Sequence, residues 1–239
     1  TEDVEAENSD VDVTAGGNVT TEDVNADHSD VDVEAGGNVT AGNVTAEDGT
    51  MDVTAGGDVT SGNVTVDNNP LNVTADRSVT AENVTAADSK VVVEAGEEVT
   101  TKDVTLDNSE LEVEAGGNVT TEDVEAENSD VDVTAGGNIT ADDIYTDNST
   151  VNFKADETIY FDMILSKRSD ISLDAGKDIL MKDGVDCGEY GEHNFIKFAD
   201  DDTDENSSLT MSAGGDIGTL ENSLILDIPE DVTTEISKV

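Results

Sequence analysis

The chain has little positive charge, few aromatic side chains and one cysteine. Each of these shortages excludes some kinds of protein. Ten Lys and Arg stand against 58 Asp and Glu, so the formal net charge is -48. Nucleic-acid phosphates would be repelled by such a chain, and we expect no nucleic-acid partner. Cys187 has no second cysteine with which to form an internal disulfide. No apolar run reaches the roughly 18 residues of a membrane-spanning helix, so we expect no insertion into a membrane.

Basic and aromatic residues are also missing from the N-terminal part, because the first basic residue is Arg77 and the first aromatic residue is Tyr145. An acidic, aromatic-poor composition ordinarily predicts a disordered chain. Here, however, the apolar residues recur at fixed spacing. The stretch DVTAGGNVT at residues 12–20 returns with few changes at multiples of 20, and residues 1–180 form nine rows of 20 without an insertion or a deletion. Such a period is typical of stacked, repetitive folds.

Positions within a row are called columns below. Columns 4, 11, 13 and 19 are apolar in every row, and column 15 is Ala throughout, from Ala15 to Ala175. Apolar columns 11, 13 and 15 alternate with mostly polar columns 12 and 14, which is the pattern of a half-buried β-strand. Turn-forming residues separate three such short strands in each row. Gly at columns 16 and 17 is expected to supply positive φ at one corner.

One row of 20 residues cannot bury its own apolar face, but stacked rows bury a continuous core. The sequence therefore predicts an all-β fold, a parallel β-helix (β-solenoid) with roughly triangular coils of 20 residues. Double glycines and strict alternation exclude an α-helical repeat. Nine regular coils should occupy residues 1–180, an insertion or irregular coil residues 181–207, and one or more final irregular coils with a tail residues 208–239.

The insertion interrupts one coil. If Met211 takes column 13, it adds 18 residues, and its apolar centre at residues 195–198 is expected to be an extra strand that covers the side or the end of the solenoid. A recognition loop is the alternative, because insertions into repeat proteins map to loops on one face, where binding often takes place.

The segments AGGNVT and AGGDVT, together with residues 208–228 and their AGGDIG at 213–218, resemble the repeats of the filamentous haemagglutinin family. That family consists of large secreted β-helical adhesins whose repeats carry a strand–AGGD/N–strand consensus. The resemblance covers the nine rows and residues 208–228. It implies an extracellular or cell-surface location, an adhesive or filamentous role, and no enzymatic activity.

Carboxylates recur in column 12, where stacked coils would hold them about 4.8 Å apart, and also in column 3. Like charges at that spacing repel by about 1 kcal/mol per pair in water. Calcium ions, which prefer oxygen ligands, would offset this repulsion, so a cation-binding ladder is one hypothesis. A solvated face whose charges are screened by salt is the other. The candidate metal ligands are Asp12, Asp32, Asp52 and Asp132.

Column 18 carries Asn in four of the nine rows, and these residues fit the N-x-[ST] sequence of N-glycosylation. The glycosylation candidates are Asn18, Asn38, Asn118 and Asn138. A ladder of stacked amides is the alternative for this column.

Catalytic motifs are missing from the sequence. His28 stands in a turn column otherwise filled mainly by Asn or Asp, and Cys187 and His193 form a pair without supporting ligands. We therefore expect no enzyme.

The sequence predicts an extracellular structural or adhesive β-solenoid, a rod or a segment of a cell-surface fibre. The alternative is a display module whose acidic ladders bind Ca²⁺ or another cation. Because the ends of a stack of coils are open β-edges, we expect the rod to associate head to tail with itself or to continue into further coils. We also expect a cell-surface or matrix partner.

Overall fold

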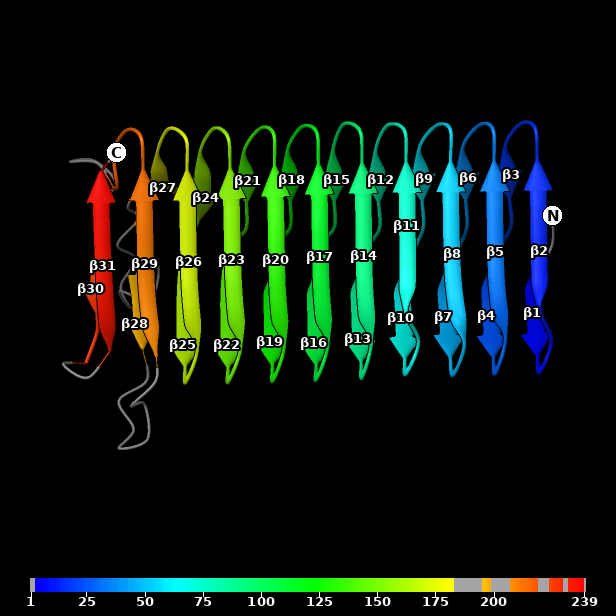
Figure 1. Cartoon of the computed structure of the whole chain (residues 1–239), viewed down its shortest axis with the longest axis horizontal. Coiled ribbons are helices and arrows are strands. Elements are labelled where there is room, and N and C mark those ends of the chain that lie inside the picture. The colour runs from blue at the N-terminus through cyan, green and yellow to red at the C-terminus, as the bar shows by residue number, and fades with distance from the viewer. Residues whose placement is uncertain (1–2, 183–194, 199–206, 219–223, 230–231, 239) are drawn as a thin grey trace, which may run out of the picture.

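A computed structural model describes residues 3–182, 195–198, 207–218, 224–229 and 232–238. The described residues form 31 β-strands in three parallel sheets, stacked as a β-solenoid (Figure 1). The predicted all-β fold and the coil of 20 residues are confirmed, since Val4 pairs with Val24 and Val24 with Val44. None of the described residues lies in a helix, so none forms a helix long and apolar enough to cross a membrane.

The three sheets are named A, B and C. Sheets A and B take one strand from each of the eleven described coils, and sheet C takes one from each of coils one to nine. Sheet A comprises β1 (Val4–Glu7), β4 (Val24–Asp27), β7 (Val44–Glu47), β10 (Val64–Asp67), β13 (Val84–Ala87), β16 (Val104–Asp107), β19 (Val124–Glu127), β22 (Asp143–Asp147), β25 (Met163–Lys167), β28 (Phe195–Phe198) and β30 (Ile225–Asp227). Sheet B comprises β2 (Val11–Ala15), β5 (Asp30–Ala35), β8 (Thr50–Ala55), β11 (Leu71–Ala75), β14 (Lys90–Ala95), β17 (Glu110–Ala115), β20 (Asp130–Ala135), β23 (Thr150–Ala155), β26 (Asp170–Ala175), β29 (Ser208–Ala213) and β31 (Thr233–Lys238). Sheet C comprises β3 (Val19–Thr20), β6 (Val39–Thr40), β9 (Val59–Thr60), β12 (Val79–Thr80), β15 (Val99–Thr100), β18 (Val119–Thr120), β21 (Ile139–Thr140), β24 (Ile159–Phe161) and β27 (Ile179–Met181).

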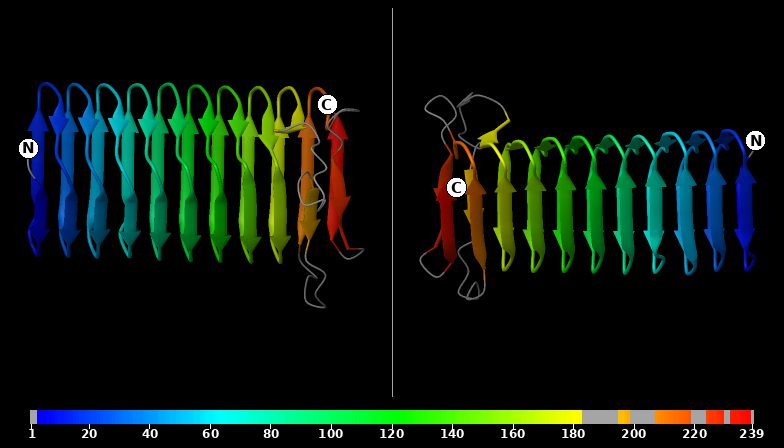
Figure 2. Two further views of the ribbon diagram at one scale, coloured as in Figure 1. Left: turned by 180° about the vertical axis from the view of Figure 1, so that it is seen from behind. Right: turned by 45° about the horizontal axis from the view of Figure 1, so that its top comes forward.

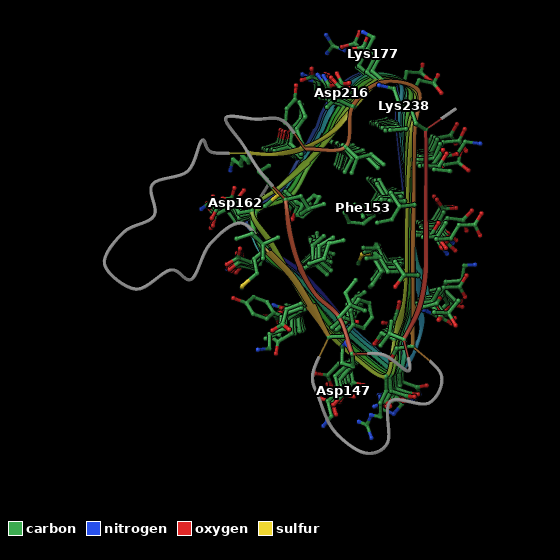
Figure 3. All side chains as sticks on the ribbon, turned by 90° about the vertical axis from the view of Figure 1, so that its left-hand side faces the viewer. Asp147, Phe153, Asp162, Lys177, Asp216 and Lys238 are labelled. Atoms are coloured by element: carbon green, nitrogen blue, oxygen red, sulfur yellow. The ribbon has the colours of Figure 1, made fainter. Side chains whose placement is uncertain are left out.

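The coils follow one another in a straight row, with the two termini at opposite ends (Figure 2). Seen along the axis, the three sheets form the sides of an elongated triangle, with Asp147, Asp162 and Lys177 near its corners (Figure 3). Sheet B is the longest side. Because side chains of a strand point alternately to its two faces, every second residue lines the inside of the triangle.

The inward-facing columns form one continuous apolar core. In β20, for example, Val131, Val133 and Ala135 are buried, whereas the residues between them are exposed. Val and Ala dominate the N-terminal coils, and larger side chains such as Phe153 and Phe161 fill the core from coil eight onward.

Positive φ occurs at column 8 and not at the double glycines, so the expectation for columns 16 and 17 is wrong. Column 8 adopts the left-handed conformation in all nine regular coils, from Asn8 (φ 52°) to Arg168 (φ 50°), and the one described glycine with positive φ is Gly218. Asn and Asp tolerate this conformation better than other non-glycine residues. Local backbone chemistry therefore explains why column 8 is nearly always Asn or Asp.

The double glycines are explained by close approach between coils. A Cβ atom on Gly36 would lie 2.9 Å from the Gly16 carbonyl oxygen, and one on Gly57 would lie 2.0 Å from Asn38 Oδ1. Both separations are too short for a side chain to be added without a shift of the neighbouring coil. Gly at column 17 leaves room for the Asn of the preceding coil in these coils, although Glu157 follows Asn138 at the same column.

A buried ladder of serines in column 9 joins the coils at the corner between sheets A and B. The Ser109 backbone N–H donates to Ser129 Oγ at 3.0 Å, and the Ser129 hydroxyl donates to the Glu127 carbonyl at 2.7 Å. The same arrangement recurs from Ser89 to Ser169. Each hydroxyl thus satisfies one polar group in its own coil and one in the coil before it.

The insertion is divided by a regular strand. A regular coil would bring column 4 to residue 184, but Ile196 pairs there with Ile164, so twelve extra residues precede β28. Column 13 would fall at residue 193, but Met211 pairs with Leu173, so the remaining six of the 18 lie between β28 and β29. Residues 195–198 are therefore the sheet A strand of coil ten, and not an extra strand laid over the solenoid. Their apolar residues Ile196 and Phe198 are buried in the core.

Replacing Ser129 with Ala should destabilise the protein. The substitution leaves the buried Ser109 N–H without its acceptor, and an unsatisfied buried donor costs about 1–3 kcal/mol. Urea unfolding followed by circular dichroism measures the loss. Thr134→Ala, an exposed change in the same coil, is the control, and equal stability of the two variants would contradict the role of the serine ladder.

Replacing Asn69 with Ser should stabilise the protein. Asn69 interrupts the ladder at column 9, is fully buried, and has no partner for its Nδ2 and Oδ1 atoms in the described part of the chain. A serine hydroxyl there would bond to the neighbouring backbone as Ser129 does, with a gain of about 1–2 kcal/mol. The exposed change Asn25→Ser should stay within about 0.5 kcal/mol of the original protein in the same unfolding assay. A less stable Asn69→Ser variant would refute the prediction.

Candidate functional site

The outer surface of sheet B, formed by columns 10, 12 and 14, is called the acidic face. Asp12, Asp32 and Asp52 lie on it in adjacent coils, exposed and in direct register. Asp132 lies on the same face, four coils beyond Asp52, where its register partner is Glu112. The structure therefore brings three of the four predicted metal ligands together and places the fourth in a separate group.

Each group of column 12 carboxylates ends at an asparagine. Asn72 Nδ2 donates to Asp52 Oδ1 at 2.6 Å, and Asn152 Nδ2 donates to Asp132 Oδ1 at 2.7 Å. An amide in this place removes one repelling charge and adds a charge-assisted hydrogen bond. Runs of like charge along the face are thereby kept to three coils or fewer.

A lysine lies between the two groups. Lys90 Nζ donates to Glu110 Oε1 at 2.7 Å and lies 3.5 Å from Glu112 Oε2. The hydrogen bond to Glu110 raises the pKa of Lys90, and the charge of Glu110 and the approach of Glu112 act in the same direction. Because this lysine is exposed, the pairing contributes little to stability, but it lowers the local excess of negative charge.

Ordered calcium sites need more oxygen ligands than one line of carboxylates offers. Calcium takes about six to eight oxygen atoms, often from several carboxylates and carbonyls around the ion. Among the described residues, no three carboxylate, imidazole or thiol groups come together in a way that could hold a metal ion. Calcium binding by Asp12, Asp32, Asp52 and Asp132 stays a prediction.

The side chains of columns 3 and 18 accept backbone hydrogen bonds from the next coil. For column 3, the sequence pattern predicted only a line of carboxylates. Asp23 Oδ1 accepts the Asn43 backbone N–H at 2.8 Å in column 3, and Asn118 Oδ1 accepts the Asn138 N–H at 2.9 Å in column 18. These short side chains tie one coil to the next at the two corners that flank sheet C. The signal was present in the sequence, because an Asp or Asn precedes the first residue of a strand in nearly every row.

The four glycosylation candidates lie in this column 18 ladder. Asn18 is exposed, and its Oδ1 accepts the Asn38 N–H at 3.0 Å. Asn38, Asn118 and Asn138 are half-buried and use their side-chain amides between coils. Asn38 also accepts a hydrogen bond of 3.1 Å from Arg77. A glycan on Nδ2 would compete with these contacts least at Asn18, and glycosylation stays a prediction.

The histidine and cysteine candidates do not form a described catalytic group. His28 occupies the left-handed column 8, where its Nδ1 contacts Asp27 and its Nε2 lies 3.4 Å from Asp48. The hydrogen bond and the charge of Asp27 raise the pKa of His28. Cys187 and His193 lie outside the described residues.

Comparison with known proteins returned no match to a family model, to a curated protein or to a solved structure. The fold by itself shows that the chain is a β-helical repeat protein.

Replacing Asp32 with Asn should stabilise the protein at low ionic strength. The change removes the central charge of the Asp12, Asp32 and Asp52 group and supplies an amide that can donate to a neighbouring carboxylate, as Asn72 does. We expect a gain of about 1 kcal/mol in the free energy of unfolding, which shrinks in roughly 1 M NaCl because salt screens exposed charges.

Asp76→Asn is the matched control, since glycines flank this exposed carboxylate in its own column. It should leave the stability nearly unchanged. The same melts are repeated with CaCl₂ and NaCl at equal ionic strength. A calcium-specific stabilisation that Asp32→Asn abolishes would contradict simple screening and establish an ion site on the acidic face.

Proposed function

We propose that this chain is a structural rod, a segment of an extracellular, adhesive cell-surface fibre. The observation that supports this most directly is the continuity of three in-register sheets through coils one to nine, two of which run on through coils ten and eleven. In such a solenoid each coil contacts only its neighbours, so the rod lengthens by adding coils without a change of cross-section. A spacer or a fibre depends on this ability to grow in length at constant width, and it does not require a binding pocket.

Both ends of the described stack suit further stacking. At one end β1 and β2, and at the other β30 and β31, each pair with only one described strand. Val4 is only partly buried at the first end, and Leu226 and Ile236 are 39% and 47% exposed at the second, whereas their equivalents Ile196 and Met211 are 0% exposed. An open β-edge beside exposed core residues is a template for another coil. In our proposal these edges continue into a second copy stacked head to tail, or into further coils.

Charge at the C-terminal end is partly balanced. Lys238 Nζ lies 2.8 Å from Asp216 Oδ1, and this pairing lowers the pKa of Asp216 and raises that of Lys238. The first coils, by contrast, carry carboxylates and no Lys or Arg. A head-to-tail contact therefore brings Lys238 of one end toward an acidic coil.

The extracellular setting and the adhesive role are supported by the resemblance of the AGGNVT and AGGDIG segments to the filamentous haemagglutinin family. A cell-surface or matrix partner belongs to the same proposal. The exposed acidic face offers such a partner groups of neighbouring carboxylates, such as Asp12, Asp32 and Asp52.

The chain should assemble head to tail as its concentration rises, and Ile236→Lys should prevent this. Stacking would bury Ile236 at column 13, and a lysine there would place an unpaired charge in the new core, which is costly. Sedimentation velocity over a concentration series, with electron microscopy of the largest species, measures assembly and shows whether fibres keep the width of one solenoid.

Ser237→Lys is the matched control, because it adds the same charge to the outer face of the same strand. It should assemble like the original protein. A single species of one copy at every concentration, or an equal loss of assembly in both variants, would count against head-to-tail stacking.

A further inference from the structure

The core of the first four coils is hollow. A cavity of about 440 Å³ lies inside coils one to four, lined mainly by valines with Met51 and Leu71 among them. A second cavity of about 80 Å³ follows it from coil three to coil eight. The core residues of coil one, such as Val11 and Val19, are only partly buried. Within the described part of the chain, the larger cavity is open at coil one.

Burial at column 13 shows how the width of the lumen changes along the rod. Val33 and Val53 face inward from sheet B in interior coils, yet they are only partly buried, whereas Phe153 and Leu173 in the same column are 2% and 0% exposed. Phe153 points into the middle of the triangle (Figure 3). Protein interiors are normally packed without large voids. Further along, the valines of the same column, such as Val113 and Val133, are buried, and the remaining void is only about 80 Å³. The small side chains of the first coils thus leave the widest part of the lumen.

We propose that this cavity binds a linear alkyl chain that carries an uncharged head group. Apolar cavities stay free of water and take up apolar molecules. This one is enclosed by three sheets and runs along the axis for four coils, about 19 Å at the spacing of parallel strands, so a chain fits it better than a ring system. Asp3 lies at its mouth, and no Lys or Arg precedes Arg77. A carboxylate head group would be repelled there.

The test titrates the protein with hexan-1-ol, octan-1-ol, decan-1-ol and dodecan-1-ol. Nuclear Overhauser contacts between the alcohol and valine methyl groups locate the ligand, and calorimetry gives its affinity. We expect saturable binding that tightens about fourfold with each added methylene until the cavity is filled. The protein is kept at a concentration at which sedimentation shows single copies, because a stacked copy would cover the mouth.

Val33→Phe combined with Val53→Phe should abolish binding by filling the lumen as Phe153 does. Thr54→Phe, which adds the same ring to the outer face of the same strand, should bind like the original protein. Val53→Leu fills less space and should weaken decan-1-ol binding several-fold with little change in the melting curve. Unsaturable uptake, or equal uptake by the filled variant, would overturn the proposal. Dodecanoate binding as tightly as dodecan-1-ol would overturn the choice of head group.

Discussion

Parallel strand pairing places each residue of a strand beside its equivalent 20 positions further on, in three sheets at once. Side chains of one column then lie directly above one another, about 4.8 Å apart. The residue type of each column must therefore be one whose side chains can stack on copies of themselves in successive coils. Valine and alanine stack well on their own kind, but Asp on Asp does not, and the amide of Asn72 beside Asp52 shows how the acidic face limits the repulsion.

Each of the three corners carries one polar ladder. Column 9 provides buried serines between sheets A and B, column 18 provides Asn between sheets B and C, and column 3 provides Asp or Asn between sheets C and A. In each ladder a side-chain oxygen accepts a backbone N–H of a neighbouring coil, where the strands have turned away and regular pairing is interrupted. Buried or half-buried backbone groups need such partners. The corners are thus as regular as the sheets, which keeps the coils aligned over the length of the rod.

The same regularity explains the proposed uses of the molecule. A stack without a special coil has no natural end, so exposed core residues such as Ile236 favour a further coil. Small side chains repeated in the first coils leave a lumen, whereas larger side chains such as Phe153 fill the core from coil eight onward. Head-to-tail stacking and the alkyl-binding cavity therefore have one origin. Both follow from the repetition of a coil whose inward-facing side chains are too small to fill the lumen.

The sequence by itself determined the coil of 20 residues, the three strands per coil and the inward-facing columns, because periodicity and alternation are properties of the order of residues. It could also have shown the left-handed column 8, since Asn and Asp recur there. Only the tertiary structure decided that Asp12, Asp32 and Asp52 form one group without Asp132, that the glycines of columns 16 and 17 avoid contact with the coil before them, and that residues 195–198 complete coil ten. These features depend on which atoms of neighbouring coils come into contact. Such contacts join residues 20 or more positions apart, so they cannot be read from the local order of residues.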